Sequence, residues 1–555
     1  MKRRDFVKTV AMSGMAVAAS DIVADLIAQT PQGRVLESKF KGLSDIALLE
    51  AKTAGCTYAD IRFTRSTNSG VNATGGNREF EGFGGFGGGG GRGGRGGGGG
   101  RGGGGGFGGF GGGGNTGPSG AAGFGVRVIH SGVWGFASSP IVTEDEIKRI
   151  TRLATEVAKA SAIAKRADVR LAPVPAYTEY WSTAFKKDPR TMAQDDRQQF
   201  VQKVVDTVVK TKEVTNVNVS VQVEHEWKYF ASSEGSYIEQ EFLTTSPSFT
   251  VTARKDGQTR SRTFSAPPAT GGWEVAEAAQ MLENAERIAA EAVEFCTAKP
   301  VDMGVKDLIL TPSHAMLTIH EIVGHATELD RILGYEANYA GTSFVKLTDV
   351  GKLKYGSKLF NVTADRNRVG GIGTTGYDDD GVKTQEWALV RDGILVGLQT
   401  NREMAHLVGE KQSRGCTHAN SWRDYPFLRM ANVHVDAGPA GSPTPEQIIA
   451  DTKDGVLIDG RGSYSIDQQR YNGQFGGNAF WEVKNGKKTR MLSNVTYNAI
   501  TTDFWGNLDA VSGKESWEMH GTGGDAKGQP TQTNSISHGS PWLRIRKILV
   551  GAAYA

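Results

Sequence analysis

The sequence contains few cysteines and carries little net charge. Its three cysteines, Cys56, Cys296 and Cys416, are odd in number and widely spaced among 555 residues, so they do not form a disulfide framework. The formal net charge of +3 is small for this length and does not indicate a nucleic-acid partner. Beyond the N-terminal region no segment has the roughly 18 unbroken apolar residues of a membrane helix, so we expect no membrane span in the mature chain.

The first 30 residues have the features of an export signal. A positively charged start precedes a mildly apolar segment that is too short to span a bilayer and ends in small residues. The paired Arg3 and Arg4, with Phe6 two residues on, resemble a twin-arginine signal. We therefore expect residues 1–30 to be a signal peptide and the protein to be exported, to the periplasm, already folded. The alternative is an ordinary disordered N-terminus.

A tract composed almost entirely of glycine occupies residues 82–114 and includes Arg92, Arg95 and Arg101. Such a segment buries too little surface to offset its conformational entropy. We expect a disordered insertion over residues 82–120, between two strands that pair across its base. Arginine–glycine repeats can also bind RNA, but for an exported protein we favour the disordered loop and expect no nucleic-acid partner.

One short stretch contains the residues that indicate chemistry. His320, Glu321 and His325 follow an apolar run, Leu308–Leu310, that is typical of a strand. At 3.6 residues per turn, histidines five positions apart point roughly 140° apart, too far for one metal ion. A single π-type turn would bring them to one side, and Gly324 is where the backbone could yield most easily. Glu321 would then be the general base. The alternative is a core helix whose histidines only make hydrogen bonds.

Further segments accompany this motif in a fixed order. In chain order they are Ala54–Arg62, Gly125–Ala137, Gly341–Phe344, Tyr377–Gly381, Arg429–Asn432 and Lys527–Pro530. Together with the histidine motif they resemble the TldD type of the TldD/PmbA family of metallopeptidases. The resemblance covers nearly everything from about residue 45 to the C-terminus, and the ordered set is much more specific than the histidine motif alone.

The resemblance implies a metal-dependent peptidase that hydrolyses peptide bonds in unfolded peptides, bound by main-chain pairing along a strand edge. Glu321 would activate water, and one divalent ion, zinc before others, would polarise the scissile carbonyl. It also implies a second subunit of the PmbA type, with a homodimer as the alternative. The rival hypothesis is a non-catalytic peptide-binding or assembly subunit of such a complex.

Two histidines are insufficient for this chemistry, because catalytic zinc usually takes three protein ligands. TldD-type relatives place a cysteine in a glycine-rich C-terminal loop, where this sequence has Asp525. A carboxylate is an accepted zinc ligand, although carboxylates also suit harder ions. We therefore predict Asp525 as the third ligand, then His520, then Glu328. Glu328 and Asp330 could instead orient the histidines as hydrogen-bond acceptors.

Hydrophobic periodicity predicts the domains around this motif. We expect an N-terminal α/β domain over residues 40–170, a central α/β domain over 175–298 and a C-terminal metallopeptidase domain over 300–555. The predicted fold class is α+β, with N-terminal α/β domains followed by a β-rich antiparallel C-terminal domain that carries the metal-binding helix.

Shorter signals predict individual elements. Asp392-Gly393 and Asn485-Gly486 indicate two-residue hairpins, and Asp454-Gly455 and Asn472-Gly473 indicate further turns. The stretch from Trp273 to Cys296 is rich in Ala and Glu and predicts one long helix.

Two other clusters contain residues that could bind ligands. Cys416 and His418 have metal-ligand chemistry, but we favour a buried thiol and a surface imidazole. Asp378–Asp380 could hold a cation or the positive end of a peptide, but such an acidic run is more often a solvated turn, which is our interpretation.

Overall fold

The computed structural model describes residues 38–76 and 122–552. The expected signal peptide (1–30) and glycine-rich insertion (82–120) lie outside these residues. Among the helices in the described ranges, none is both long enough and apolar enough to cross a membrane.

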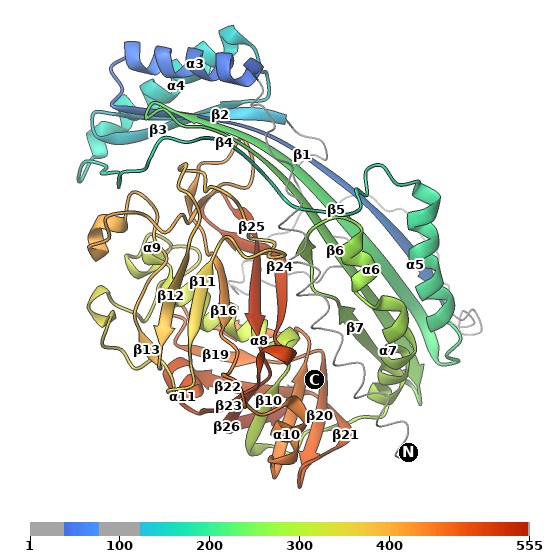
Figure 1. The fold of residues 1–555 in the computed structure, drawn as a ribbon. Coiled ribbons are helices and arrows are strands. Elements are labelled where there is room, and N and C mark those ends of the chain that lie inside the picture. Colours follow the sequence, from blue (N-terminus) through green and yellow to red (C-terminus); the bar gives the residue numbers. More distant parts are fainter. Residues whose placement is uncertain (1–37, 77–121, 553–555) are drawn as a thin grey trace, which may run out of the picture.

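The N-terminal half of the described chain forms a long curved sheet that arches over the C-terminal half (Figure 1). Its strands lie in the order β3 (Val133–Ser139), β2 (Ala122–His130), β1 (Tyr58–Gly75), β5 (Val214–Ser232), β6 (Tyr237–Lys255) and β4 (Thr178–Ser182), with β7 (Gln258–Ser265) and β8 (Ala269–Thr270) also paired to β6. β1 pairs with β5 from Asp60 to Gly75, so the sheet runs across the expected boundary near residue 170. β1 also pairs with β2, as predicted for the two strands that flank the glycine tract.

Two groups of helices cover this sheet. α3 (Ser38–Thr53) and α4 (Glu144–Ser161) lie at one end, and α5 (Gln194–Val208), α6 (Glu274–Ala278) and α7 (Met281–Cys296) lie at the other (Figure 1). α4 begins after Thr143, whose side chain accepts a hydrogen bond from the backbone N–H of Glu146. The prediction of one helix from Trp273 to Cys296 was wrong, because Gln280 adopts a left-handed conformation (φ 53°) that separates α6 from α7.

A second sheet, of ten strands, forms the base of the C-terminal region. Its order is β18 (Tyr464–Ile466), β19 (Asn472–Phe475), β22 (Val495–Ile500), β26 (Leu543–Ala552), β10 (Gly304–Leu310), β17 (Asp454–Asp459), β20 (Ala479–Lys484), β21 (Lys487–Ser493) and β9 (Lys299–Pro300), with β23 (Leu508–Val511) paired to β26. The turns predicted at Asp454-Gly455 and Asn472-Gly473 were wrong, because both pairs lie within strands, β17 and β19. Cross-strand pairing there outweighed the local turn preference.

The predicted hairpins are confirmed. Asp392-Gly393 joins β12 (Glu386–Arg391) to β13 (Ile394–Leu395), and Asn485-Gly486 joins β20 to β21. All four turn residues have positive φ, between 48° and 77°, as two-residue type I′ turns require.

Smaller elements complete the C-terminal region. β13 and β12 continue into β11 (Val362–Asp365) and β16 (Asn432–Val435), while β14 (Thr417–His418) pairs with β15 (Phe427–Leu428) and β24 (Glu518–Lys527) pairs with β25 (Gln532–Ser540). The helices are α8 (Pro312–Ile319), α9 (Leu329–Ile332), α10 (Pro445–Ala450) and α11 (Thr501–Gly506). α8 contacts both β17 and the β24–β25 hairpin, and its Leu317 and Ile319 are buried in the largest hydrophobic core. The fold is therefore mixed α and β, rich in sheet, with α8 held between sheets.

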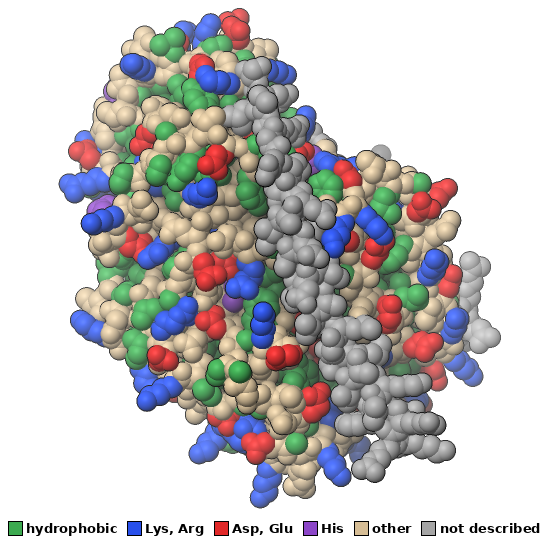
Figure 2. Space-filling model, viewed as in Figure 1, with side chains coloured by type: hydrophobic (Ala, Val, Ile, Leu, Met, Phe, Trp, Pro, Cys, Tyr) green, Lys and Arg blue, Asp and Glu red, His purple; other side chains and the backbone are tan. Residues whose placement is uncertain are grey.

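The surface shown in Figure 2 mixes the two signs of charge. Among the described residues on that face, Lys and Arg side chains alternate with Asp and Glu, without a large area of one sign.

Candidate metal centre

The helix after β10 changes its winding at the two histidines. The buried apolar residues of β10 lead to Pro312, which suits the first turn of α8. α8 then continues into a π-turn, η4 (His320–Gly324), where the backbone N–H of His325 donates to the carbonyl oxygen of His320. This i→i+5 bond brings the two imidazole centroids to 4.5 Å. The predicted π-turn is present, and it puts both rings on one side.

Hydrogen bonds determine which nitrogen each imidazole presents. His538 Nδ1 lies 3.0 Å from the carbonyl oxygen of Val433 and must donate to it, so His538 Nε2 accepts from His320 Nδ1 at 2.8 Å. His325 Nδ1 lies 2.8 Å from a carboxylate oxygen of Glu328 and donates to it. Both histidines therefore turn Nδ1 toward a hydrogen-bond partner and present Nε2, which is the atom available to a metal ion.

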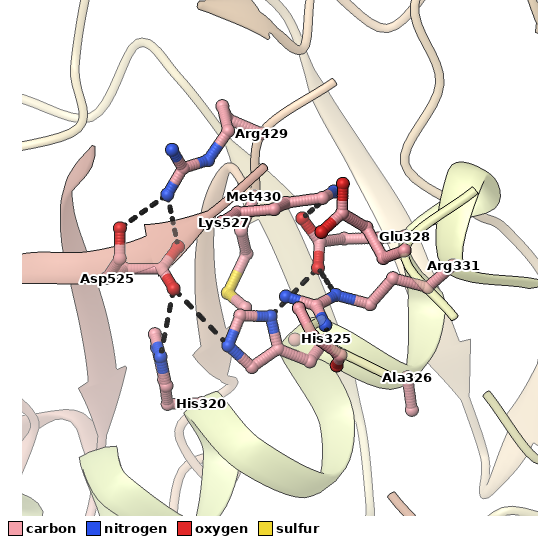
Figure 3. Close-up of polar contacts among 12 residues, drawn as sticks. His320, His325, Ala326, Glu328, Arg331, Arg429, Met430, Asp525 and Lys527 are labelled. Atoms are coloured by element: carbon pink, nitrogen blue, oxygen red, sulfur yellow. Dashed lines mark hydrogen bonds and ion pairs between the residues drawn. The ribbon is translucent and has the colours of Figure 1, made fainter. Parts of the chain in front are cut away.

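Asp525, on β24, faces these two nitrogens (Figure 3). Its Oδ1 lies 3.4 Å from His325 Nε2 and 3.7 Å from His320 Nε2, and the three ligand atoms all lie within 4.8 Å of one another. Arg429 donates to Oδ2 at 3.1 Å, so that oxygen is occupied. His320 Nε2 and Asp525 Oδ1 are buried without a hydrogen-bond partner. The imidazole nitrogens of the histidine turn and a carboxylate oxygen from β24 thus point toward one position.

The protonation states of this group suit a cation. Burial, with His325 adjacent, lowers the pKa of His320 well below its ordinary value, which keeps the imidazole neutral. Burial would raise the pKa of Asp525, but His325 and Arg429 hold it well below its ordinary value, which keeps the carboxylate ionised. Tetrahedral zinc bonds place neighbouring ligand atoms about 3.3–3.6 Å apart. The donors present therefore fit a divalent metal ion in charge, type and spacing.

The other predicted ligands make different contacts. Glu328 accepts hydrogen bonds from His325, Arg331 and Lys527, so it orients His325 instead of offering a free oxygen. Asp330 binds Lys527 at 2.8 Å and orients neither histidine. His520 Nε2 lies 3.2 Å from Glu518.

Glu321 lies inside the same π-turn, between the two histidines in sequence. Its side chain is buried, and burial raises its pKa above the ordinary value for glutamic acid. A carboxylate with a raised pKa is a stronger proton acceptor than an exposed one, which is what a general base near neutral pH requires.

Sequence reasoning missed two residues that hold this group in place, His538 and Arg429. His538 is an isolated histidine in β25, and its sequence neighbourhood shows no ligand spacing. Arg429 lies in one of the segments that resemble the peptidase family. That resemblance indicated that the segment matters, but it did not indicate that Arg429 binds Asp525. Their contacts arise across 218 and 96 residues of sequence, respectively.

Gly324 serves a different purpose from the one predicted. Its backbone is ordinarily helical (φ −55°, ψ −61°), so the π-turn does not depend on glycine's conformational freedom. A Cβ atom at this position would lie 2.4 Å from Met430 Sδ and 2.8 Å from its Cε. Glycine leaves room here for the Met430 side chain, which packs directly on the turn.

We expect Gly324→Ala to destabilise the protein by about 1–3 kcal/mol, because the added methyl group overpacks a full site. Met430→Ala should separately cost about 2–5 kcal/mol through the cavity that it leaves. Since the two side chains compete for the same space, the double variant should cost less than the sum of the single changes. Urea unfolding of the wild type, the two single variants and the double variant measures this coupling. If the losses in unfolding free energy simply added, contact with Met430 would not be the reason that glycine is favoured at position 324.

The acidic run Asp378–Asp380 is not a solvated turn. Its side chains are at most 6% exposed where they pair with cations, and Arg127 lies 2.7 Å from Asp60 and 2.8 Å from Asp380. Asp379 lies 3.5 Å from Lys228 and 3.8 Å from Arg62. The prediction was wrong because the curved sheet covers this loop with three cations. The run joins the sheet to the C-terminal region.

Cys416 is buried, as predicted, whereas the His418 side chain is 22% exposed and therefore only partly at the surface.

The fold and this buried group of possible ligands define a class of protein, one that can hold a divalent metal ion. Residues 116–162, 181–298 and 304–552 match domain 1, the central domain and the C-terminal domain of the PmbA/TldA metallopeptidases. Since these matches together cover well over half of the chain, the protein belongs to the PmbA/TldA metallopeptidase family. The predicted family is thereby confirmed, while nothing in the matches bears on export.

Individual relatives agree with this assignment. A metalloprotease of Methanocaldococcus jannaschii is 26% identical over 401 residues, which are 70% of this chain and 83% of the relative. A zinc metalloprotease TldD homolog of Saccharolobus solfataricus is 22% identical over 77% of this chain and 90% of its own length. The crystal structure of TldE from Thermococcus kodakarensis superposes with a TM-score of 0.65 at 14% identity, covering 92% of this chain and 99% of TldE. That structural likeness concerns the fold alone.

Proposed function

We propose that this protein hydrolyses peptide bonds in unfolded peptides, using one divalent metal ion, zinc before others, held by His320, His325 and Asp525, with Glu321 as the general base. The observation that carries the proposal is the buried convergence of the Nε2 atoms of His320 and His325 and the Oδ1 atom of Asp525 within 4.8 Å of one another. A divalent ion at such a point polarises a carbonyl group and lowers the pKa of water.

Each protein group then has a defined part in the proposed reaction. Glu321 accepts the proton of the attacking water and passes it to the departing amine nitrogen. His538 and Glu328 hold the two imidazoles in the tautomer that exposes Nε2. Arg429 occupies Oδ2 of Asp525 and so directs Oδ1 toward the histidines.

Burial of the site supports unfolded peptides as the substrate class. The side chains of His320, His325 and Asp525 are at most 4% exposed. A folded domain cannot bring its backbone to atoms so enclosed, whereas an extended single chain needs only a narrow passage. Extended peptides can also pair with a strand edge through their main chain.

We propose that the protein works with a second subunit of the PmbA type, or as a homodimer. The similarity in fold to TldE supports an assembly between related chains. Light scattering of the protein alone distinguishes the two arrangements, since a stable homodimer would have twice the mass of the chain.

The proposed chemistry is tested by Glu321→Gln, which keeps the shape of the side chain but cannot accept a proton. We expect the variant to keep its metal ion and to lose about 10²–10⁴-fold in kcat, the usual contribution of a general base. Metal analysis and cleavage of an unfolded reporter peptide provide the two readouts.

Glu518→Gln is the matched control, because Glu518 is a half-exposed glutamate that faces His520 on β24. It should leave cleavage unchanged. Wild-type protein without bound metal would favour the alternative, a non-catalytic peptide-binding or assembly subunit.

A further inference from the structure

Arg470 combines a strained backbone with a buried charge. It lies in the loop between β18 and β19, it is 8% exposed, and its φ is 61°, in the left-handed region that favours glycine. Non-glycine residues in this conformation tend to occur at functional sites, because only the surrounding structure can hold them there. The loop therefore needs an explanation beyond connecting two strands.

The loop is held rigidly on both sides. The Asp467 side chain accepts hydrogen bonds from the backbone N–H groups of Gln469, Tyr471 and Asn472. The Arg470 carbonyl oxygen accepts from the Thr501 hydroxyl at 2.7 Å. The backbone at Arg470 is therefore held in place by the fold.

A second segment keeps space open for the guanidinium group. Backbone N–H groups of Thr342 and Phe344 donate to carbonyl oxygens of the loop at 2.6 and 2.8 Å. Beside them, a Cβ atom on Gly341 would lie 2.4 Å from the Gln468 carbonyl oxygen and 2.7 Å from Arg470 Nη1, so a larger residue would crowd both the loop backbone and the guanidinium.

The Arg470 guanidinium lacks an anionic partner. Over residues 38–76 and 122–552, no carboxylate oxygen lies within 4.0 Å of it, and its buried Nε has no hydrogen-bond partner. Nη1 reaches only the carbonyl oxygens of Asp467 and Gln468, at 3.4 and 3.5 Å, beyond the usual hydrogen-bond length.

Two buried arginines of the candidate metal centre are paired with carboxylates, and Arg366, which has no carboxylate partner among the described residues, donates to the carbonyl oxygens of Arg429 and Met430 at 3.1 and 3.0 Å. Arg331 is paired with Glu328, and Arg429 with Asp525. Buried charges are almost always neutralised in this way, since leaving one unpaired in the interior is costly. A buried cation with open donors indicates that an anion from outside the chain binds there.

The charge of Arg470 acts on the proposed active site. Burial and the positive charge of Arg331 lower the pKa of Arg470 to about 10, while Glu321, Glu328 and Asp525 act in the opposite direction. In return, Arg470 is among the charges that lower the pKa of Glu321, after His325. The segment that packs against Arg470 also contacts the histidine turn, because the Ser343 hydroxyl donates to the carbonyl oxygen of Ala326, the residue after His325, at 2.6 Å.

We propose that Arg470 is a substrate-binding residue that donates hydrogen bonds to an anionic oxygen of the peptide beside Glu321. This inference rests on the proposed function. The oxygen is either that of the scissile carbonyl, which gains negative charge as water adds to its carbon, or that of the terminal carboxylate of the peptide. A guanidinium suits both, because its planar N–H donors match oxyanion and carboxylate geometry.

Arg470→Gly tests the proposal, because φ 61° is natural for glycine and the variant should fold without strain. We expect thermal stability to be equal or higher and kcat/KM to fall by about 10²–10³-fold, as when one oxyanion donor is lost. A purely structural arginine predicts the opposite pattern, lower stability with activity kept per folded molecule. Arg470→Lys, which keeps the charge, should restore part of the activity.

Two peptides of one sequence, ending in a free carboxylate or in an amide, separate the two sources of the oxygen. If Arg470→Gly lowers kcat for both peptides, the oxygen that Arg470 binds is that of the scissile carbonyl. If the variant raises KM only for the peptide with a free carboxylate, the oxygen belongs to the terminal carboxylate. Lys547→Gly, which also removes a cation from the left-handed region (φ 56°), is the matched control and should change neither constant. Unchanged constants in Arg470→Gly would overturn the inference.

A binding experiment keeps this test separate from the proposed function. If the wild type does not cleave either peptide, calorimetry compares their binding to the wild type and to Arg470→Gly. Weaker binding of the free-carboxylate peptide by the variant would support an anion site at Arg470 even though peptide hydrolysis had failed. Equal binding of both peptides by both proteins would overturn the site.

Discussion

Asp525→Ala is expected to remove the metal ion from the protein. The change deletes the only charged ligand of the proposed set and leaves two neutral imidazoles, whereas catalytic zinc sites usually have three protein ligands. It also leaves Arg429 buried without its carboxylate, which should cost about 3–5 kcal/mol of stability. Metal analysis after gel filtration should find about one ion per chain in the wild type and almost none in the variant.

Matched variants separate loss of a ligand from loss of the fold. Asp525→Asn keeps the size of the side chain but not its charge, and should bind metal weakly while remaining folded. Asp525→Cys supplies a thiolate, a soft ligand, and should keep zinc while discriminating more strongly against harder ions such as Mn²⁺.

The other sequence candidates provide the opposing controls. His520→Ala should keep a full complement of metal, because His520 contacts Glu518 and stands outside the donor group. If Asp525→Ala retained metal and His520→Ala lost it, the assignment of the third ligand would be wrong and the β24–β25 hairpin would have to shift on metal binding.

Arg127→Met is expected to destabilise the protein by about 3–5 kcal/mol, the usual cost of removing one partner of a buried ion pair. Arg127 on β2 binds Asp60 on β1 and Asp380 in the C-terminal region, and all three side chains are at most 6% exposed. Methionine fills similar space but leaves two buried carboxylates without their cation. Urea unfolding followed by tryptophan fluorescence measures the loss.

Arg149→Met is the control for this experiment. Arg149 also pairs with a carboxylate, Glu146, at 2.7 Å, but its side chain is 61% exposed. Exposed pairs contribute about 0–1 kcal/mol because water screens them. Equal effects of the two substitutions would mean that the Arg127 cluster does not join the curved sheet to the C-terminal region.

The histidine turn is a feature that local helix geometry predicts. Helical geometry alone showed that a spacing of five needs a π-turn, because the angle between two side chains depends only on local winding. The hairpins at Asp392-Gly393 and Asn485-Gly486 followed equally from local dihedral preferences. Where a strand imposed its own pairing, as at Asn472-Gly473, the same kind of local signal failed.

The residues around the site show where such reasoning ends. Nothing near His538 in sequence indicates that its Nε2 accepts a hydrogen bond from a histidine 218 positions away. The acidic run Asp378–Asp380 looked solvated because its buried partners, among them Arg127 and Lys228, lie in strands distant in sequence.

The sequence by itself determined the local chemistry of this protein: a turn that unites His320 and His325, the carboxyl group of Glu321 between them, and a carboxylate at position 525 in a glycine-rich segment. These features depend on residues a few positions apart. Only the tertiary structure decided which oxygen of Asp525 faces the imidazoles, which imidazole nitrogens point toward it, and that Arg470 has no carboxylate partner within the described part of the chain. Those outcomes depend on burial and on contacts between distant strands, which leave no periodic trace in the chain.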